Sequence, residues 1–343
     1  MKPELIFLIS QPRAGSTMLQ RMLGAHPKVH TISEPWLMLH PLYALKRNAL
    51  TAEYNSRLAR EALDTVFDAL PEGEDGYIQG LRTMYGYLYA RLLEGSGKSV
   101  FLDKTPRYYL IIPELARVFP EAKFIILLRN PLAVLVSILN SWVKEDWRRL
   151  RNFQTDLFRA PGLLADGLPN LGDRAAKVQY EELVHDPEDH IRNLSRFLEI
   201  PFDPATIDYG DGSSPDWRFG DQKSVHQLRQ PDPRKATQWM DSLDDPQVWR
   251  CARDYLEFLR PELLTRLGYR YEELCEQMGR HEPSPLDRAA TWPLTHLCQF
   301  PDRKDGFVGA ITHSLAHRGA TGTASAALRR LRQALASVAG DCM

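Results

Sequence analysis

The sequence predicts an α/β fold in which helices flank a central parallel sheet. Short apolar runs alternate with stretches of helical periodicity, the pattern of chains built from strand–helix units. The run KFIILL at 123–128 is apolar almost throughout, as expected of a central strand covered on both faces. The run LIFLIS at 5–10 leads through a tight loop into a helical pattern, the arrangement that presents a helix N-terminus to an anion. Together these observations favour a P-loop-like, three-layer fold.

Five strands and six helices are expected along this alternating part of the chain. The strands are 5–10, 29–32, 99–102, 123–128 and 176–180. The helices are 16–25, 51–70, 80–94, 107–118, 131–148 and 187–199. The segment 200–236 is rich in Gly, Pro, Asp and Ser and is expected to be irregular. A polar loop of that length is either functional or disordered.

The composition fits one large domain followed by an appendage. The 343 residues are 43% hydrophobic, enough to bury a sizeable core. We expect the main domain to span 1–275 and a mainly helical, partly irregular appendage to span 276–343. Its last part, AALRRLRQALASV, predicts a basic amphipathic helix. That helix is either solvated or docks on the body or on a partner, which would include a second copy of the chain.

Charge and cysteine content exclude several classes of protein. Lys and Arg number 43 against 44 Asp and Glu, so no overall field favours nucleic acid. The first apolar run is too short for a signal peptide or a membrane span, and we expect a cytoplasmic protein. The cysteines form no CxxC pair and have no clustered histidines, which predicts neither a disulfide framework nor a metal site. They are Cys251, Cys275, Cys298 and Cys342.

The loop PRAGST after the first strand is suited to an anion. Gly15 permits close approach of the backbone, and Arg13 adds a forked charge that matches a phosphate or sulfate group. Ser16 and Thr17 add hydroxyl donors and are expected to cap the following helix; capping alone is the structural alternative. The loop lacks both the first glycine and the lysine of GxxxxGK[ST], which disfavours an ordinary ATPase or kinase.

A second anion-binding pair follows the central strand. Arg129 ends that strand, and Asn130 and Pro131 suit the N-cap and first position of the next helix. Ser137 lies about two turns into this helix, where its hydroxyl is able to join Arg129 around one phosphate. The alternative for Arg129 is a structural ion pair with a carboxylate.

With these two motifs and the segment KVQYEELVHDPEDHIRNLSRFLEIPFD, the chain resembles the PAPS-dependent sulfotransferases over roughly residues 1–270. The order and spacing are similar to the branch that contains tyrosylprotein sulfotransferases and bacterial small-molecule sulfotransferases. The resemblance implies transfer of a sulfuryl group from 3′-phosphoadenosine 5′-phosphosulfate (PAPS) to a hydroxyl, with 3′,5′-bisphosphoadenosine (PAP) as product and no metal. One departure is Ser141, where the tyrosylprotein enzymes carry another arginine.

The resemblance also implies which residues bind the donor. The loop holds the 5′-phosphosulfate, the helix pair holds the 3′-phosphate, a tyrosine lies beside the adenosine, and the late loop 221–239 closes over the nucleotide. In that order the residues are Arg13, Ala14, Gly15, Ser16 and Thr17; Arg129 and Ser137; Tyr180; and Ser224 and Lys235. The alternative for Tyr180 is a core aromatic at a strand end.

Direct sulfuryl transfer needs positioning, charge stabilisation and a base. Glu34 falls where the family places its catalytic carboxylate, and we assign it as general base; a structural, salt-bridged Glu is the alternative. His226 is the rival base because its pKa lies near neutrality. Lys104, with Arg13, would neutralise charge on the bridging oxygen, unless it belongs to a surface pair with Asp103. We expect Asp103 to orient Lys104 or Arg13.

Five of these positions come at or just after the carboxyl end of an expected strand, where ligands bind in open parallel sheets. They are Arg13, Glu34, Lys104, Arg129 and Tyr180. The aromatic-rich stretch 36–95 is expected to be mostly core, with the remainder lining a pocket for a small-molecule, lipid or glycan acceptor. The other candidate functions are a P-loop-like ATP-dependent phosphotransferase and a non-catalytic nucleotide-binding interaction module.

Overall fold

The computed structural model describes residues 4–46, 52–211, 229–289 and 291–297. Their contacts divide the chain into two units, 1–43 with 64–300 and 44–63 with 301–343. The first unit contains the sheet and the candidate site. The described residues of the second unit include the first half of helix α3 (Ser56–Ala69).

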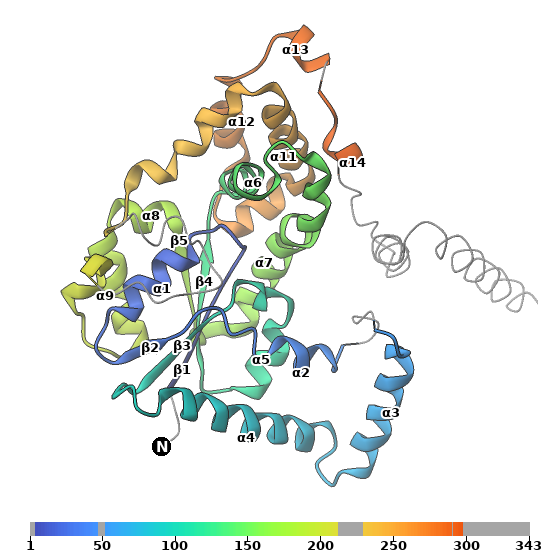
Figure 1. Cartoon of the computed structure of the whole chain (residues 1–343), viewed down its shortest axis with the longest axis vertical. Helices are drawn as coiled ribbons and strands as arrows, with labels where there is room; N and C mark the ends of the chain where they lie inside the picture. Colours follow the sequence, from blue (N-terminus) through green and yellow to red (C-terminus); the bar gives the residue numbers. More distant parts are fainter. Residues whose placement is uncertain (1–3, 47–51, 212–228, 290, 298–343) are drawn as a thin grey trace, which may run out of the picture. The chain divides into compact units, whose positions relative to one another are not determined.

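A five-stranded parallel sheet forms the centre of the first unit, as the sequence predicts (Figure 1). Its order is β2-β3-β1-β4-β5. The strands are β1 (Glu4–Ser10), β2 (Val29–Thr31), β3 (Val100–Lys104), β4 (Lys123–Leu128) and β5 (Ala175–Gln179). The neighbours β3, β1 and β4 are buried over nearly their whole length, which explains why their sequences do not alternate between apolar and polar residues.

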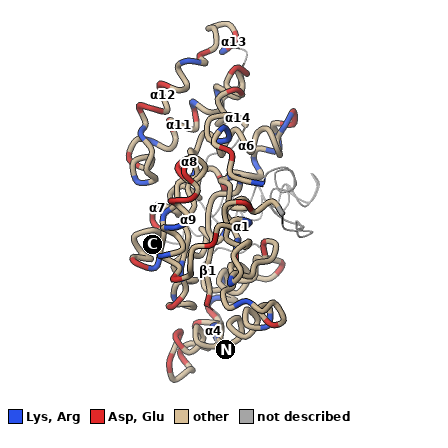
Figure 2. Tube along the Cα trace, turned by 90° about the vertical axis from the view of Figure 1, so that its left-hand side faces the viewer, with Lys and Arg blue, Asp and Glu red and all other residues tan. Residues whose placement is uncertain are grey.

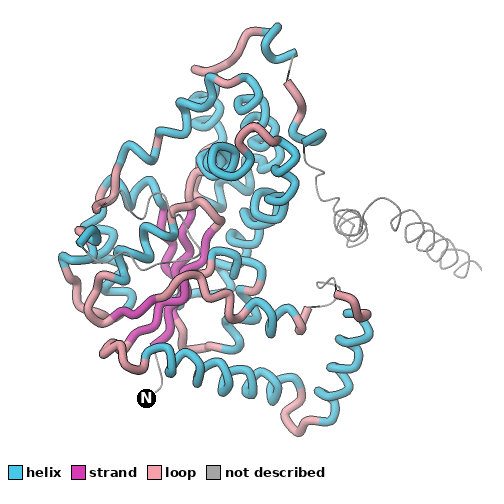
Figure 3. Tube along the Cα trace, in the orientation of Figure 1, coloured by secondary structure: helices cyan, strands magenta, loops and turns pink. Residues whose placement is uncertain are grey.

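Helices cover both faces of the sheet, so the three-layer α/β fold is confirmed (Figure 3). One face packs against α1 (Ser16–Gly24), α8 (Tyr180–His185) and α9 (Pro187–Leu198). The other face packs against α4 (Glu74–Leu93), α5 (Ile112–Val118) and α7 (Ala160–Leu171). Phe7 lies at the centre of this second face and contacts the rings of Tyr89, Tyr108 and Phe124.

A second hydrophobic core lies beyond the sheet, around α6 (Pro131–Ile138). It is completed by α11 (Pro246–Leu267), α12 (Tyr271–Gly279) and α14 (Leu294–Leu297), while α13 (Pro285–Ala289) contacts α11. The indole of Trp249 donates to the carbonyl of Met278, and Gln247 exchanges two hydrogen bonds with the backbone of Trp292. Met278 and Trp292 are therefore both hydrogen-bonded to side chains of α11.

The helix after β4 is shorter than the expected 131–148. After Ile138 it widens into a π-turn over Leu139–Val143, with Lys144 N donating to the carbonyl of Leu139 at 2.7 Å. Lys144 adopts φ 53°, which ends the helix. Such π-turns recur at functional sites because they re-aim side chains. Here the turn carries Asn140, Ser141 and Trp142.

The short helix α2 (Leu39–Tyr43) follows the loop after β2. Figure 2 shows Lys and Arg interspersed with Asp and Glu along the described trace, in keeping with the even charge balance. Within the described residues, no helix combines the length and hydropathy that crossing a membrane requires.

Candidate active site

A cavity of about 730 Å³ opens at the carboxyl edge of the sheet. Its lining comes from the loop after β1, the segments after β2, β3, β4 and β5, and α6. Four of the five residues expected at this edge line the cavity, namely Arg13, Glu34, Arg129 and Tyr180. Lys104 lies behind this surface, fully buried, and reaches the site through Glu34. The five positions do converge on one place.

The loop after β1 leaves the N-terminus of α1 open. Gly15 is the N-cap residue, with φ 98° and no side-chain capping bond, so the expectation that Ser16 and Thr17 cap the helix is wrong. A Cβ at Gly15 would lie 2.4 Å from Cδ2 of Tyr180, which only glycine avoids. Ser16 and Thr17 line the cavity from the first turn, whereas Ala14 is buried beneath the loop.

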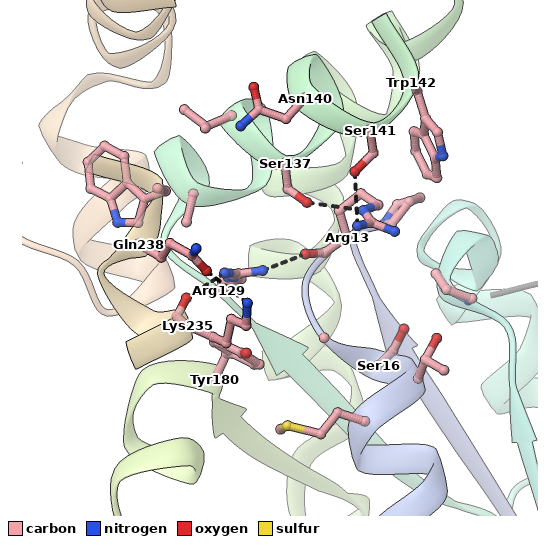
Figure 4. Close-up of a pocket in the computed structure, with 18 of the residues that line it drawn as sticks. Arg13, Ser16, Arg129, Ser137, Asn140, Ser141, Trp142, Tyr180, Lys235 and Gln238 are labelled. Atoms are coloured by element: carbon pink, nitrogen blue, oxygen red, sulfur yellow. Dashed lines mark hydrogen bonds between the residues drawn. The ribbon is translucent and has the colours of Figure 1, made fainter. Parts of the chain in front are cut away.

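The side chain of Arg13 lies along α6. Its Nε donates to Ser137 Oγ at 3.1 Å, and a terminal nitrogen donates to Ser141 Oγ, also at 3.1 Å (Figure 4). The guanidinium lies 5.4 Å from the centre of the Trp142 ring. Its forked charge therefore lies beside Ser141.

Arg129 joins the loop after β1 to the late loop. Its two terminal nitrogens donate to the carbonyl oxygens of Arg13 (3.0 Å) and Lys235 (2.9 Å) (Figure 4). Its guanidinium lies 4.3 Å from the centre of the Tyr180 ring. These partners are carbonyls and a ring rather than the carboxylate of a structural ion pair. Among the described residues, the buried Nε of Arg129 has no hydrogen-bond partner, and a buried donor of this kind calls for an acceptor.

The late loop is described only from residue 229 onward. Lys235 lies on a 3₁₀ turn (Pro233–Ala236), and its Nζ donates to Gln238 Oε1 at 2.9 Å. Ser224 and His226 lie outside the described residues.

Glu34 and Lys104 form an ion pair at the edge of the cavity, with 2.7 Å between Oε1 and Nζ. The side chain of Lys104 is fully buried and that of Glu34 is 11% exposed, so Lys104 does not belong to a surface pair. The other carboxylate oxygen of Glu34 accepts from the indole of Trp36 at 3.1 Å.

Asp103 precedes Lys104 on β3 and therefore points to the opposite face of the sheet. Its carboxylate accepts hydrogen bonds from the hydroxyls of Tyr89, Tyr108 and Thr105. The expectation that Asp103 orients Lys104 or Arg13 is wrong. Burial raises the pKa of Asp103 to about 6, and the three hydroxyls limit that rise.

Residues 3–204 match the family model described as "Sulfotransferase family". The chain belongs to the sulfotransferase family. The resemblance drawn from the loop, the Arg129–Ser137 pair and the segment around Tyr180 is confirmed.

Curated relatives of this sulfotransferase include Nodulation protein NoeE of Sinorhizobium fredii, which is 28% identical over 302 residues. That match covers 78% of this chain and 66% of the relative, just under two thirds of its length. Protein-tyrosine sulfotransferase 1 of Danio rerio is 27% identical over 292 residues, covering 82% of this chain and 77% of the relative. Among solved structures, the sulfotransferase domain from the Synechococcus PCC 7002 olefin synthase has 27% identity and a TM-score of 0.48. It covers 69% of this chain and 88% of that domain.

Two further side chains of this sulfotransferase line the cavity beside Glu34. Trp36 belongs to the aromatic-rich stretch from which lining residues were expected, whereas Arg107 was missed from the sequence. Arg107 donates to both carboxylate oxygens of the buried Asp156, at 3.0 and 2.6 Å, and lies 5.2 Å from the Trp36 ring. The nearness of Arg107 to Lys104 in the run DKTPR was an available signal. The pairing of Arg107 with Asp156 could not be read from the sequence, because 49 residues separate the two.

Proposed function

We propose that this sulfotransferase transfers the sulfuryl group of PAPS to a hydroxyl of a small-molecule, lipid or glycan acceptor by in-line displacement. The observation that carries the proposal is that the two expected anion-binding groups, Arg13 with residues 15–17 and Arg129 with Ser137, line one cavity. Its volume of about 730 Å³ is in the usual range for ligand pockets, roughly 300–1,000 Å³.

The donor set fits a nucleotide that carries anions at both ends. At one end, Gly15 and the open N-terminus of α1 present backbone N–H groups, with the Ser16 and Thr17 hydroxyls beside them. At the other end, the guanidinium of Arg129 lines the cavity and is a charged donor for the 3′-phosphate. Ser137 accepts from Arg13 and keeps its own proton to donate.

Tyr180 stands between the two ends. Its ring packs against Gly15 on one side and beneath the guanidinium of Arg129 on the other. The side chain is thus both a core aromatic and part of the cavity wall. In the proposed complex it lies beside the adenosine and keeps the two anion sites at a constant separation.

The bound donor supplies an activated sulfuryl group whose leaving oxygen belongs to the 5′-phosphate. Glu34 takes the proton of the attacking hydroxyl, since its carboxylate faces the cavity and each of its oxygens retains a lone pair. Lys104 and Arg13 stabilise the charge that develops on the bridging oxygen. His226 remains the rival base, and Ser224 and Lys235 the donors of the late loop.

Binding calorimetry separates this proposal from the two alternatives. Tight binding of PAP without metal supports sulfuryl transfer, whereas binding of ATP that requires magnesium supports the phosphotransferase. An interaction module would bind nucleotide without turning over PAPS. Incubation of cell extract with the enzyme and ³⁵S-labelled PAPS, followed by identification of the labelled compound, then defines the acceptor. PAP binding that is absent, or present only with magnesium, would sink the proposal.

A further inference from the structure

Asp103 is a buried carboxylate that the proposed chemistry does not use. It is 1% exposed, and three hydroxyls donate to it: Tyr89 (2.6 Å) and Tyr108 (2.9 Å) to Oδ2, and Thr105 (2.8 Å) to Oδ1. An ionised carboxylate only accepts hydrogen bonds, so all three hydroxyl protons point toward it. Asp103 therefore determines the orientation of each hydroxyl.

Two of these hydroxyls also hold the chain segment that carries Glu34. The oxygen of Tyr108 accepts from the backbone N–H of Met38 at 3.0 Å, and that of Thr105 accepts from the N–H of Trp36 at 3.4 Å. Because their protons are directed at Asp103, their lone pairs are available to these amides. Tyr89 reaches the same carboxylate oxygen from α4.

This segment needs to be held in place. Trp36 has φ 53°, a left-handed conformation that is costly for a bulky residue and persists only where the surroundings impose it. The same residue donates its indole N–H to Glu34 Oε2. A shift of the Trp36 backbone would therefore move a hydrogen-bond partner of the proposed base.

We propose that Asp103 is a positioning residue for Glu34, acting through the hydroxyls of Tyr108 and Thr105 on the backbone of residues 36–38. Consecutive residues of β3 then hold the same catalytic segment in two ways. Lys104 binds the carboxylate of Glu34, and Asp103 acts through the Tyr108 hydroxyl on the main chain at Met38. The inference rests on the proposed role of Glu34 as general base.

The test compares two matched variants, Tyr108→Phe and Tyr89→Phe. Each removes one fully buried hydroxyl from the same oxygen of Asp103, but only Tyr108 also contacts Met38. In Tyr108→Phe we expect hydrogen exchange at the Met38 amide to accelerate by about fivefold, the factor that one net hydrogen bond of about 1 kcal/mol supplies. We expect kcat to fall by a similar factor at unchanged KM for PAPS. Tyr89→Phe should leave both quantities within about twofold of the wild type.

Equal effects of the two variants on exchange and on kcat would overturn the inference. If Tyr108→Phe fails to fold, Thr105→Val replaces it, with exchange read at the Trp36 amide, which donates to the Thr105 hydroxyl. Thr105→Ser is the conservative variant that should restore the wild-type values. Unchanged exchange at Trp36 and unchanged kcat in Thr105→Val would also overturn the inference. The exchange measurement needs no turnover. A wild-type enzyme that is inactive with PAPS would thus refute the proposed function, while exchange at Met38 still decides the role of Asp103.

Discussion

Replacing Arg129 tests the nucleotide site most directly. Its two terminal nitrogens each donate one hydrogen bond, to the carbonyls of Arg13 and Lys235, and the guanidinium, which lines the cavity, has further N–H groups to donate to a ligand. A hydrogen bond between charged groups contributes about 1.5–3 kcal/mol, which corresponds to about 10- to 150-fold in affinity. Arg129→Gln should weaken PAP binding by that factor.

The assay compares PAP with adenosine 5′-monophosphate, which lacks the 3′-phosphate, by calorimetry on each variant. Arg129→Gln should reduce the preference for PAP, whereas general damage to the site would weaken both ligands alike. Arg234→Gln is the matched control. Arg234 lies in the late loop that Arg129 contacts, next to Lys235, but its side chain is 89% exposed. An unchanged ratio of PAP to monophosphate affinity in Arg129→Gln would refute the assignment of Arg129 to the 3′-phosphate.

Three further predictions concern the loop, the base and the buried carboxylate. Gly15→Ala should lower the midpoint of thermal unfolding and abolish PAP binding, because its Cβ would overlap Tyr180; Gly97→Ala, also at positive φ but in open space, should only lower the midpoint slightly. Glu34→Gln should reduce kcat by about 100-fold or more while PAP affinity persists, and a retained rate together with loss in His226→Ala would transfer the role of base to His226. Asp103 has a pKa raised from 3.8 to about 6, so the folded state binds more protons than the unfolded state between these values. Its contribution to stability is therefore fully present below pH 3.8 and is lost as the pH rises through about 6; urea unfolding of wild type and Asp103→Asn across this window should show the difference in slope.

Much of the fold was predictable because its signals are local. The run at 123–128 indicated a strand covered on both faces, and it became β4 within the sheet. The helix after Arg129 began where Asn130 and Pro131 predicted, with the Asn130 side chain accepting from Leu132 N. Its end was not predictable, because the π-turn at Leu139–Val143 arises in the packed core around α6 rather than from a breaker residue.

The candidate site was predictable in its members but not in its pairings. Ser137 was expected to join Arg129 around one phosphate, and its hydrogen bond with Arg13 was not foreseen. Asp103 was expected beside Lys104 or Arg13, yet strand alternation points it into the core on the other face. Such pairings depend on side-chain directions that a linear motif does not specify.

The sequence alone determined the five strands and six of the helices, the phosphate-type loop and the set of residues at the carboxyl edge, because periodicity and turn chemistry act between near neighbours. The tertiary structure decided which of these residues touch. The contacts between Arg13 and Ser137, between Lys104 and Glu34, and between Tyr108 and Met38 join positions 70 or more residues apart. Packing of separate elements, rather than any local preference, brings such positions within hydrogen-bond distance.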